Sequence, residues 1–213
     1  MAVLLSLSVA LTGCGKSSTG NTDNDDILKG MREATVMITV GEYHGSGVII
    51  GLDDEKLTIV TVAHLMEGFD QGIISFFSGK VGFADVSDIY PGKDLCFLTI
   101  KRTDMTEDFI ETLTTAAYDL DRYEALTRGD KVYITGSAVS VAANISEGTF
   151  VSRDYYVADF DMDMMFLYAA VMEGMSGSGV YDSDGYLVGI LAGGSDADEA
   201  VCVSLKDIID LWR

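Results

Sequence analysis

Short apolar or alternating runs recur along this chain, and they constrain its fold more than any other feature. Each run has about five residues, is rich in Val, Ile, Phe and Tyr, and is bounded by turn residues. The chain has 23 glycines and a single proline, which suits the many tight turns of an all-β protein. Evenly spaced short strands over 213 residues predict a sandwich or barrels. The runs that we interpret as strands are Ala34–Val40, Gly47–Ile50, Leu57–Val62, Ile73–Phe77, Leu95–Ile100, Lys131–Thr135, Met165–Ala170, Tyr186–Leu191 and Ala200–Val203.

Two segments depart from this pattern of short, evenly spaced apolar runs. Residues 104–127 are longer, mixed and partly helical in pattern, which is typical of a connector between two β units. Residues 204–213 carry apolar side chains at helical spacing, and either Ser204 or the turn after it would cap the helix. The sequence therefore predicts an all-β chain that closes with a C-terminal helix.

The charge balance excludes some partners. With 34 acidic and 14 basic residues the net charge is −20, which argues against a nucleic-acid partner and against adsorption to anionic lipid. Solubility explains such a charge most simply, and selection of basic substrates is the other interpretation. Three cysteines are too few for a disulfide scaffold, and Cys96 and Cys202 lie in apolar runs typical of buried positions.

The N-terminus has the pattern of an export signal. Residues 2–13 form an apolar stretch too short to cross a bilayer as a helix, and Leu11-Thr12-Gly13-Cys14 resembles the bacterial lipobox. In that motif the cysteine is lipidated and becomes the first residue of the mature chain. We therefore expect a signal peptide over residues 1–13, lipidation at Cys14 and a flexible polar tether over residues 14–30.

A second motif overlaps the lipobox. Residues 10–17 satisfy a relaxed phosphate-loop pattern that ends in Lys16 and Ser17. That chemistry needs a helix to begin at the lysine, so that its first amides point at phosphate. The polar residues that follow do not start a helix, which disfavours nucleotide binding.

Three residues have the chemistry of a serine hydrolase, in which a base activates the hydroxyl and an acid orients the base. His64 ends an apolar run, Asp94 begins another, and Ser176 stands in Gly-Met-Ser-Gly-Ser-Gly. Each has a purely structural alternative: a satisfied core histidine, the end of a turn and a glycine-rich hairpin. The only other histidine, His44, is expected in a solvated turn.

The order of these residues along the chain distinguishes between the known classes of serine hydrolase. No histidine follows Ser176, and Gly-x-Ser-x-Gly is absent around it, so the α/β-hydrolase order is excluded. The order His64, Asp94, Ser176 is that of chymotrypsin.

The flanking residues resemble the chymotrypsin-like superfamily, and further segments resemble its bacterial HtrA/Deg branch. Thr-Val-Ala-His-Leu, Asp-Leu-Cys-Phe-Leu and Gly-Met-Ser-Gly-Ser-Gly are similar to the histidine, acid and nucleophile motifs. The likeness spans roughly residues 33–213. It implies two six-stranded antiparallel β-barrels with a C-terminal helix, in a protease domain over residues 31–213. The expected parts are a first barrel at 31–103, a connector at 104–127, a second barrel at 128–203 and a helix at 204–213.

The resemblance also implies a site. His64, Asp94 and Ser176 would be the catalytic triad, and the amides of Gly174 and Ser176 would form the oxyanion hole. The primary specificity pocket would have Ala170 at its floor, which suggests cleavage after small or medium apolar residues. Met175, Ser178 and Gly179 depart from the family pattern, and no peptide-binding PDZ domain is expected after the C-terminal helix. The full set of expected pocket residues is Ala170, Val171, Met172, Glu173, Ala192, Gly193 and Gly194.

The resulting hypothesis is a serine endopeptidase that acts on proteins or peptides without a metal or other cofactor. It would be exported and anchored to the membrane through lipid on Cys14. The alternative hypothesis is a protease fold that has lost activity and serves as a binding module.

Overall fold

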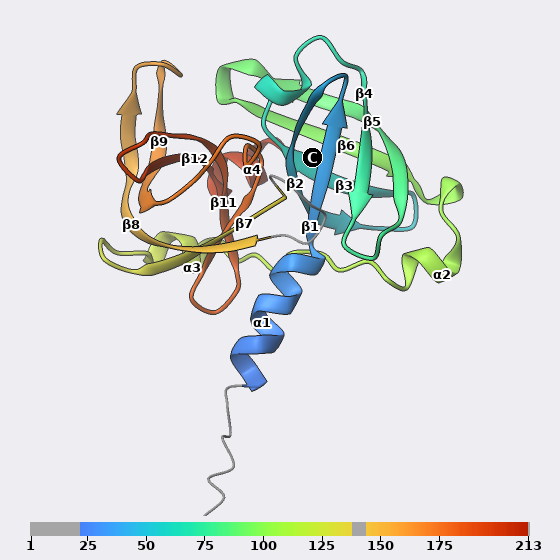
Figure 1. Ribbon diagram of the computed structural model, residues 1–213, viewed down its shortest axis with the longest axis horizontal. Coiled ribbons are helices and arrows are strands. Elements are labelled where there is room, and N and C mark those ends of the chain that lie inside the picture. The colour runs from blue at the N-terminus through green and yellow to red at the C-terminus, as the bar shows by residue number, and fades with distance from the viewer. Residues whose placement is uncertain (1–21, 138–143, 213) are drawn as a thin grey trace, which may run out of the picture.

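The computed structural model describes residues 22–137 and 144–212 and contains two closed barrels side by side (Figure 1). The first barrel has the strand order β1-β2-β3-β6-β5-β4, all antiparallel. Its core forms because apolar side chains alternate along the strands, as in β1, where Val36, Ile38 and Val40 are buried. Its strands are β1 (Thr35–Val40), β2 (Tyr43–Leu52), β3 (Lys56–Thr61), β4 (Gln71–Phe76), β5 (Val81–Tyr90) and β6 (Leu95–Lys101).

The second barrel repeats this arrangement with the order β10-β11-β12-β9-β8-β7. The predicted fold class, two six-stranded antiparallel barrels with a C-terminal helix, is confirmed. Each predicted run coincides with a strand, whereas β5, β8 and β10 were not among the predicted runs. The strands are β7 (Lys131–Gly136), β8 (Asn144–Val157), β9 (Met162–Ala169), β10 (Gly179–Asp182), β11 (Leu187–Gly194) and β12 (Glu199–Ser204).

The helix α1 (Thr22–Glu33) corrects the predicted tether, because residues 22–30 are helical and not flexible. Ile27 and Met31 lie one turn apart and pack against the turn at Gly185 in the second barrel, and Met31 is almost completely buried. Tertiary packing of this short apolar stripe therefore stabilises a segment whose composition alone indicates a polar linker. Figure 1 shows α1 leading away from the barrels.

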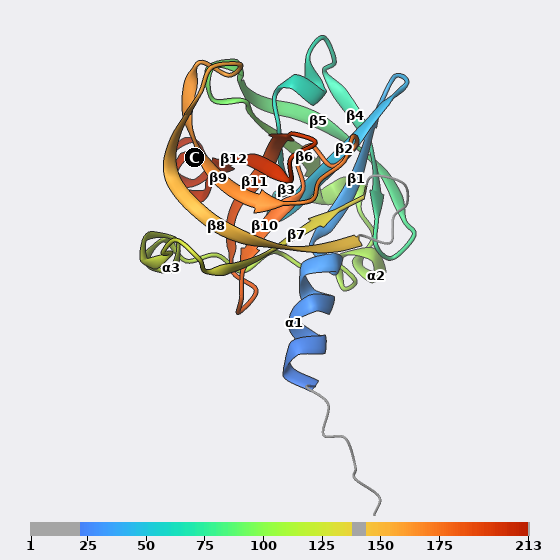
Figure 2. The ribbon, with the colours of Figure 1, turned by 60° about the vertical axis from the view of Figure 1, so that its left-hand side comes forward.

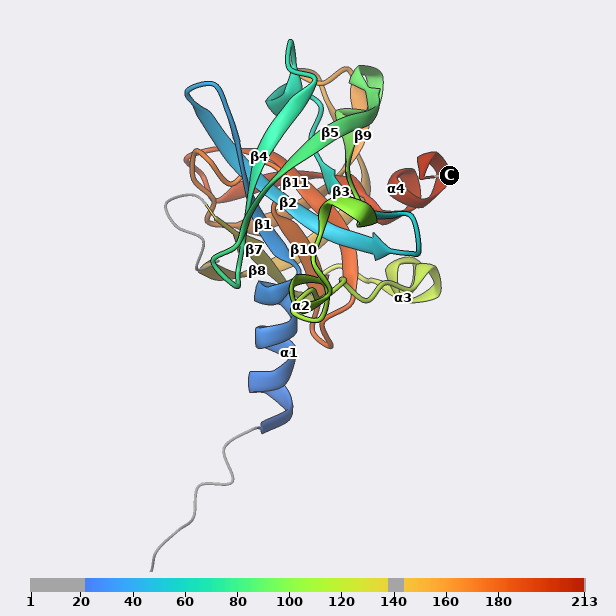
Figure 3. The ribbon, with the colours of Figure 1, turned by 90° about the vertical axis from the view of Figure 1, so that its right-hand side faces the viewer.

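The remaining α-helices lie between the two barrels in sequence or after the second barrel. The connector contains α2 (Glu107–Ile110) and α3 (Leu120–Ala125), and α4 (Leu205–Leu211) follows the last strand. Ser204 caps α4 by accepting a hydrogen bond from the Asp207 amide, as predicted. Figure 3 shows α4 at the C-terminal end of the chain. Although α4 follows the second barrel, the Trp212 ring after it lies against Gly51 of β2 in the first barrel.

The interface between the barrels is polar at its centre. The Thr35 and Thr135 hydroxyls are buried and share a hydrogen bond of 2.8 Å. Next to them, the Ser137 amide donates to Ser46 Oγ at 2.9 Å, which links β2 to the end of β7. Because buried polar groups need partners, these bonds hold one relative position of the barrels. Across residues 22–137 and 144–212, none of the helices is long and apolar enough to span a bilayer.

Candidate active site

His64 and Asp94 are in contact at the edge of the first barrel. His64 begins the short 3₁₀ helix η1 (His64–Met66) after β3, and Asp94 lies between the 3₁₀ helix η2 (Pro91–Lys93) and β6. Both Asp94 carboxylate oxygens lie 3.0 Å from His64 Nδ1, and Oδ1 also accepts the His64 amide at 3.0 Å. A carboxylate at Nδ1 favours the tautomer with the proton on that nitrogen, so Nε2 is left as the proton acceptor.

The local backbone delivers the Asp94 carboxylate to this position. Asp94 has φ +46°, in the left-handed region, and its amide donates to the Pro91 carbonyl. Aspartate tolerates this region better than most residues. The side chain is buried, with 7% of its area exposed, and the His64 ring is the partner that such a carboxylate needs.

Ser176 lies across the same cleft, between β9 and β10 of the second barrel. It lines a pocket of about 460 Å³ together with His64, which we call the central pocket. Within the described residues no hydrogen bond joins Ser176 Oγ to His64. The central pocket is lined by Tyr43, His44, His64, Leu65, Glu67, Phe69, Glu173, Gly174 and Ser176.

The two backbone amides expected to form an oxyanion hole are free to donate. Gly174 has φ +85°, a conformation that favours glycine. Neither its amide nor that of Ser176 donates to a group in the described part of the chain, whereas the amides of Met175 and Gly177 have carbonyl partners. The two amides are therefore available to another acceptor.

Two residues of the first barrel, Ser46 and Thr61, hold the loop of the second barrel that contains Ser176, the predicted nucleophile. We call Ser46, Thr61, Ser176 and Gly177 the nucleophile clamp. The Ser46 amide donates to the Ser176 carbonyl at 2.7 Å, and Thr61 Oγ1 donates to the Ser46 carbonyl at 2.7 Å. Gly177, at φ +84°, lies so close that a Cβ atom would overlap the Ser46 carbonyl oxygen. Thr61 ends β3, three residues before His64. The clamp therefore connects the loop that contains Ser176 to the strand that precedes the histidine.

A second cavity of about 290 Å³ adjoins Ser176, and we call it the glycine pocket. It contains five of the seven residues predicted for the specificity pocket, but not Ala170 or Ala192. Ala170 is exposed because β9 ends at Ala169 and the chain turns outward, and Ala192 is buried within β11. The pocket is lined by Val171, Met172, Glu173, Ser176, Leu191, Gly193, Gly194, Ser195 and Asp196.

The glycine pocket is narrow. A Cβ atom at Gly194 would overlap Val171 Cγ2, so the valine side chain fills the space beside the glycine backbone. Any larger residue at position 194 would have to displace that valine.

A family model described as trypsin-like peptidase domain matches residues 45–190, which is more than half of the chain. The chain belongs to the trypsin-like peptidases. The match includes all three of His64, Asp94 and Ser176. None of the curated proteins matches the sequence.

Solved structures share the fold of this trypsin-like peptidase. The HtrA-type protease AlgW, solved with a tripeptide, has a TM-score of 0.75 and 21% identity over 88% of this chain and 62% of AlgW. The Rv3671c protease in an inactive form has a TM-score of 0.69 and 16% identity over 88% of this chain and 91% of its own. A mutant of Rv3671c from M. tuberculosis H37Rv, also in an inactive form, gives a TM-score of 0.69, 16% identity, and coverage of 88% and 89%. The peptidase thus spans less than two thirds of the AlgW chain.

Sequence reasoning missed several residues of the cleft. His44, which we predicted in a turn, is exposed as predicted but lies in β2 and lines the central pocket. Tyr43, Glu67 and Phe69 line it too, and no motif marked them. On the other side of His64, the β8–β9 hairpin brings Asp159 into a third cavity of about 340 Å³. This cavity, the histidine pocket, also contains Phe160, Ile89 and Glu67, and Figure 2 shows the hairpin reaching toward β5.

The other residues considered for chemistry are the cysteines, a possible metal site and the two N-terminal candidates Cys14 and Lys16. Burial raises the pKa of the Cys96 thiol to about 12 and also raises that of Cys202, so neither is a nucleophile near neutral pH. No group of His, Cys, Asp and Glu that could hold a metal occurs in residues 22–137 and 144–212. Cys14 and Lys16, the candidates for lipidation and nucleotide binding, lie outside the described residues.

Proposed function

We propose that this trypsin-like peptidase is a serine endopeptidase with His64, Asp94 and Ser176 as its triad. The observation that carries the proposal is the contact of both Asp94 oxygens with His64 Nδ1 at 3.0 Å, on a ring that shares a pocket with Ser176. In an unliganded site the hydrogen bond from serine to histidine is commonly long, and it tightens when substrate is bound.

The reaction follows from these positions. His64 Nε2 takes the proton of Ser176 Oγ as that oxygen bonds to the substrate carbonyl carbon, and Asp94 stabilises the resulting imidazolium. The amides of Gly174 and Ser176 donate to the oxyanion. When the C–N bond breaks, His64 gives the proton to the leaving amine, and water then hydrolyses the acyl-enzyme by the same route. Each oxyanion donor is worth roughly 3–4 kcal/mol of transition-state stabilisation.

We also propose that small or medium apolar residues precede the cleaved bond. The prediction rested on Ala170, which lies outside the glycine pocket. The contact between Val171 and Gly194 now supports it better, because it narrows that pocket. No cofactor takes part in the proposed reaction.

Labelling with a fluorophosphonate probe tests the mechanism, because only an activated serine reacts. Wild type should be labelled and Ser176→Ala should not. Ser178→Ala is a matched control, because its hydroxyl is buried two residues away without a hydrogen-bond partner. An unlabelled but folded wild-type protein would overturn the proposal.

The second candidate function is a binding module without activity. The missing hydrogen bond between Ser176 and His64 favours it. Failed labelling together with retained binding of unstructured peptides would establish this function in place of hydrolysis.

For localisation we propose export and anchoring through lipid on Cys14. The support is the lipobox-like sequence alone. Cys14→Ser should abolish incorporation of labelled palmitate and release the protein from the membrane fraction. Unchanged membrane association of that variant would refute the anchor.

A further inference from the structure

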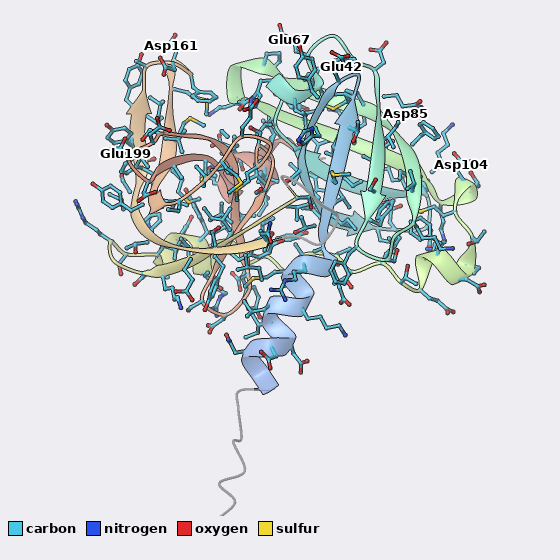
Figure 4. All side chains as sticks on the ribbon, viewed as in Figure 1. Glu42, Glu67, Asp85, Asp104, Asp161 and Glu199 are labelled. Carbon is cyan, nitrogen blue, oxygen red and sulfur yellow. The ribbon has the colours of Figure 1, made fainter. Side chains whose placement is uncertain are left out.

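Carboxylates without partners surround the candidate catalytic cleft. Glu67 and Glu173 line the central pocket, and Glu67 also lines the histidine pocket with Asp159. Asp196 lines the glycine pocket. All four are exposed, and none makes a salt bridge or a side-chain hydrogen bond within the part of the chain that the structure describes. Figure 4 shows Glu67 at the top of the first barrel.

Cations are missing from the same cleft. Among the described residues, no lysine or arginine lines the central, histidine or glycine pockets. Lys93, which precedes Asp94 in the sequence, forms a salt bridge of 2.8 Å with Asp207. Arg122 and Lys131 line a different pocket, where each has an acidic partner. The cleft therefore has a negative potential that no neighbouring side chain neutralises.

The shape of the site indicates where a compensating cation would bind. The glycine pocket has a volume of about 290 Å³, and no aromatic residue is among those that line it. The central pocket, which also contains Ser176, is larger, at about 460 Å³, and its lining includes the aromatic residues Tyr43 and Phe69 as well as the two glutamates. Aromatic rings and carboxylates together suit the alkyl stem and charged end of a basic side chain.

We infer that the enzyme selects peptides with lysine or arginine shortly after the cleaved bond. The inference rests on the proposed function, in which the glycine pocket receives the side chain before the bond. The central pocket then receives the residues that follow the bond, where Glu67 and Glu173 attract a cation. The substrate class is thus a peptide with a small apolar residue before the bond and a basic residue after it.

Three peptides test this inference. They share a small apolar residue before the bond and differ only at the second position after it, which is lysine, glutamine or glutamate. For wild type, kcat/KM should follow the order Lys, Gln, Glu, with about a tenfold range at low salt. In about 1 M salt, where the screening length is only about 3 Å, the range should fall below about twofold.

Charge-removing variants locate the effect. Glu67→Gln and Glu173→Gln should each lower the preference for lysine over glutamate by about threefold. Asp104→Asn is the control, because it removes one charge from a residue that lines none of the three pockets and that lies far from Glu67 in Figure 4, and it should keep the full preference.

The outcomes separate this inference from the proposed function. Cleavage of the glutamine peptide by wild type and not by Ser176→Ala establishes hydrolysis alone. If all three peptides are then cleaved equally, or if Asp104→Asn acts like Glu67→Gln, the inference fails while the protease remains. If wild type cleaves none of the peptides and resists the fluorophosphonate probe, both proposals fail.

Discussion

Replacing Gly177 by alanine tests whether the nucleophile clamp fixes the position of Ser176. At φ +84° the new Cβ would overlap the Ser46 carbonyl oxygen and lie 2.5 Å from Thr61 Oγ1. The left-handed conformation costs alanine roughly 1–2 kcal/mol. Overpacking a buried site adds about 1–3 kcal/mol. Gly79→Ala is the matched control, because its φ is +79° and a Cβ atom there would meet no other atom within 4 Å.

Urea unfolding of the two variants separates the cost of the left-handed backbone from the cost of the steric overlap. The free energy of unfolding of Gly79→Ala should fall only by the backbone cost, and that of Gly177→Ala should fall by about 1–3 kcal/mol more. The overlap is relieved only if Ser46 moves relative to Gly177, and Ser46 holds the Ser176 carbonyl. Fluorophosphonate labelling of folded Gly177→Ala should therefore slow by at least about tenfold, because an increase of about 1.4 kcal/mol in the activation free energy is enough for that effect. Equal stability of the two variants, or labelling of Gly177→Ala at the wild-type rate, would refute this reasoning.

Three further predictions concern the acid, the barrel interface and the thiols. Asp94→Asn should fold normally and lose about 10⁴-fold in kcat, because the amide favours the wrong histidine tautomer; a loss below tenfold would contradict the assignment. Thr35→Val should cost about 1–3 kcal/mol by leaving buried groups unpaired, and the double variant with Thr135→Val should cost less than the sum of the two single losses, as urea unfolding would measure. Strict additivity would mean that the two hydroxyls are not coupled. Iodoacetamide at about pH 8.5, the ordinary pKa of a thiol, should leave Cys96 and Cys202 unmodified in the folded protein and alkylate both in urea, as peptide mass mapping would show. Modification of either in the folded state would contradict its burial.

The sequence predicted those strands whose pattern is strong on its own. β3 and β6 are almost continuously buried, so their apolar runs stand out. β5 was missed because only Ala84 in its ten residues is buried and polar residues interrupt it. β10 was missed because its four residues follow the glycine-rich nucleophile loop without a turn signal between them. Position in a barrel, and not the pattern of either segment, makes these residues strands.

The residues of the candidate site also differ in whether the sequence could predict them. The identities and order of His64, Asp94 and Ser176 were readable because the proposed catalysis restricts the residue types. Ser46 was not, because a serine in a strand has no distinguishing pattern and its role depends on which loop packs against it. Glu67 and Tyr43 were also missed, since membership of a pocket depends on how the two barrels meet, which local spacing does not encode.

The two sides of the proposed triad depend on the opposite barrel to different degrees. On the acid side, Lys93 next to Asp94 pairs with Asp207 of α4, but both side chains are partly exposed, so this contact contributes little. Asp94 and His64 also belong to one barrel and contact each other directly. On the nucleophile side, the Ser176 carbonyl is held by a first-barrel amide in a buried interface. Changes at the barrel interface should therefore displace the hydroxyl from the ring before they disturb the contact between ring and carboxylate.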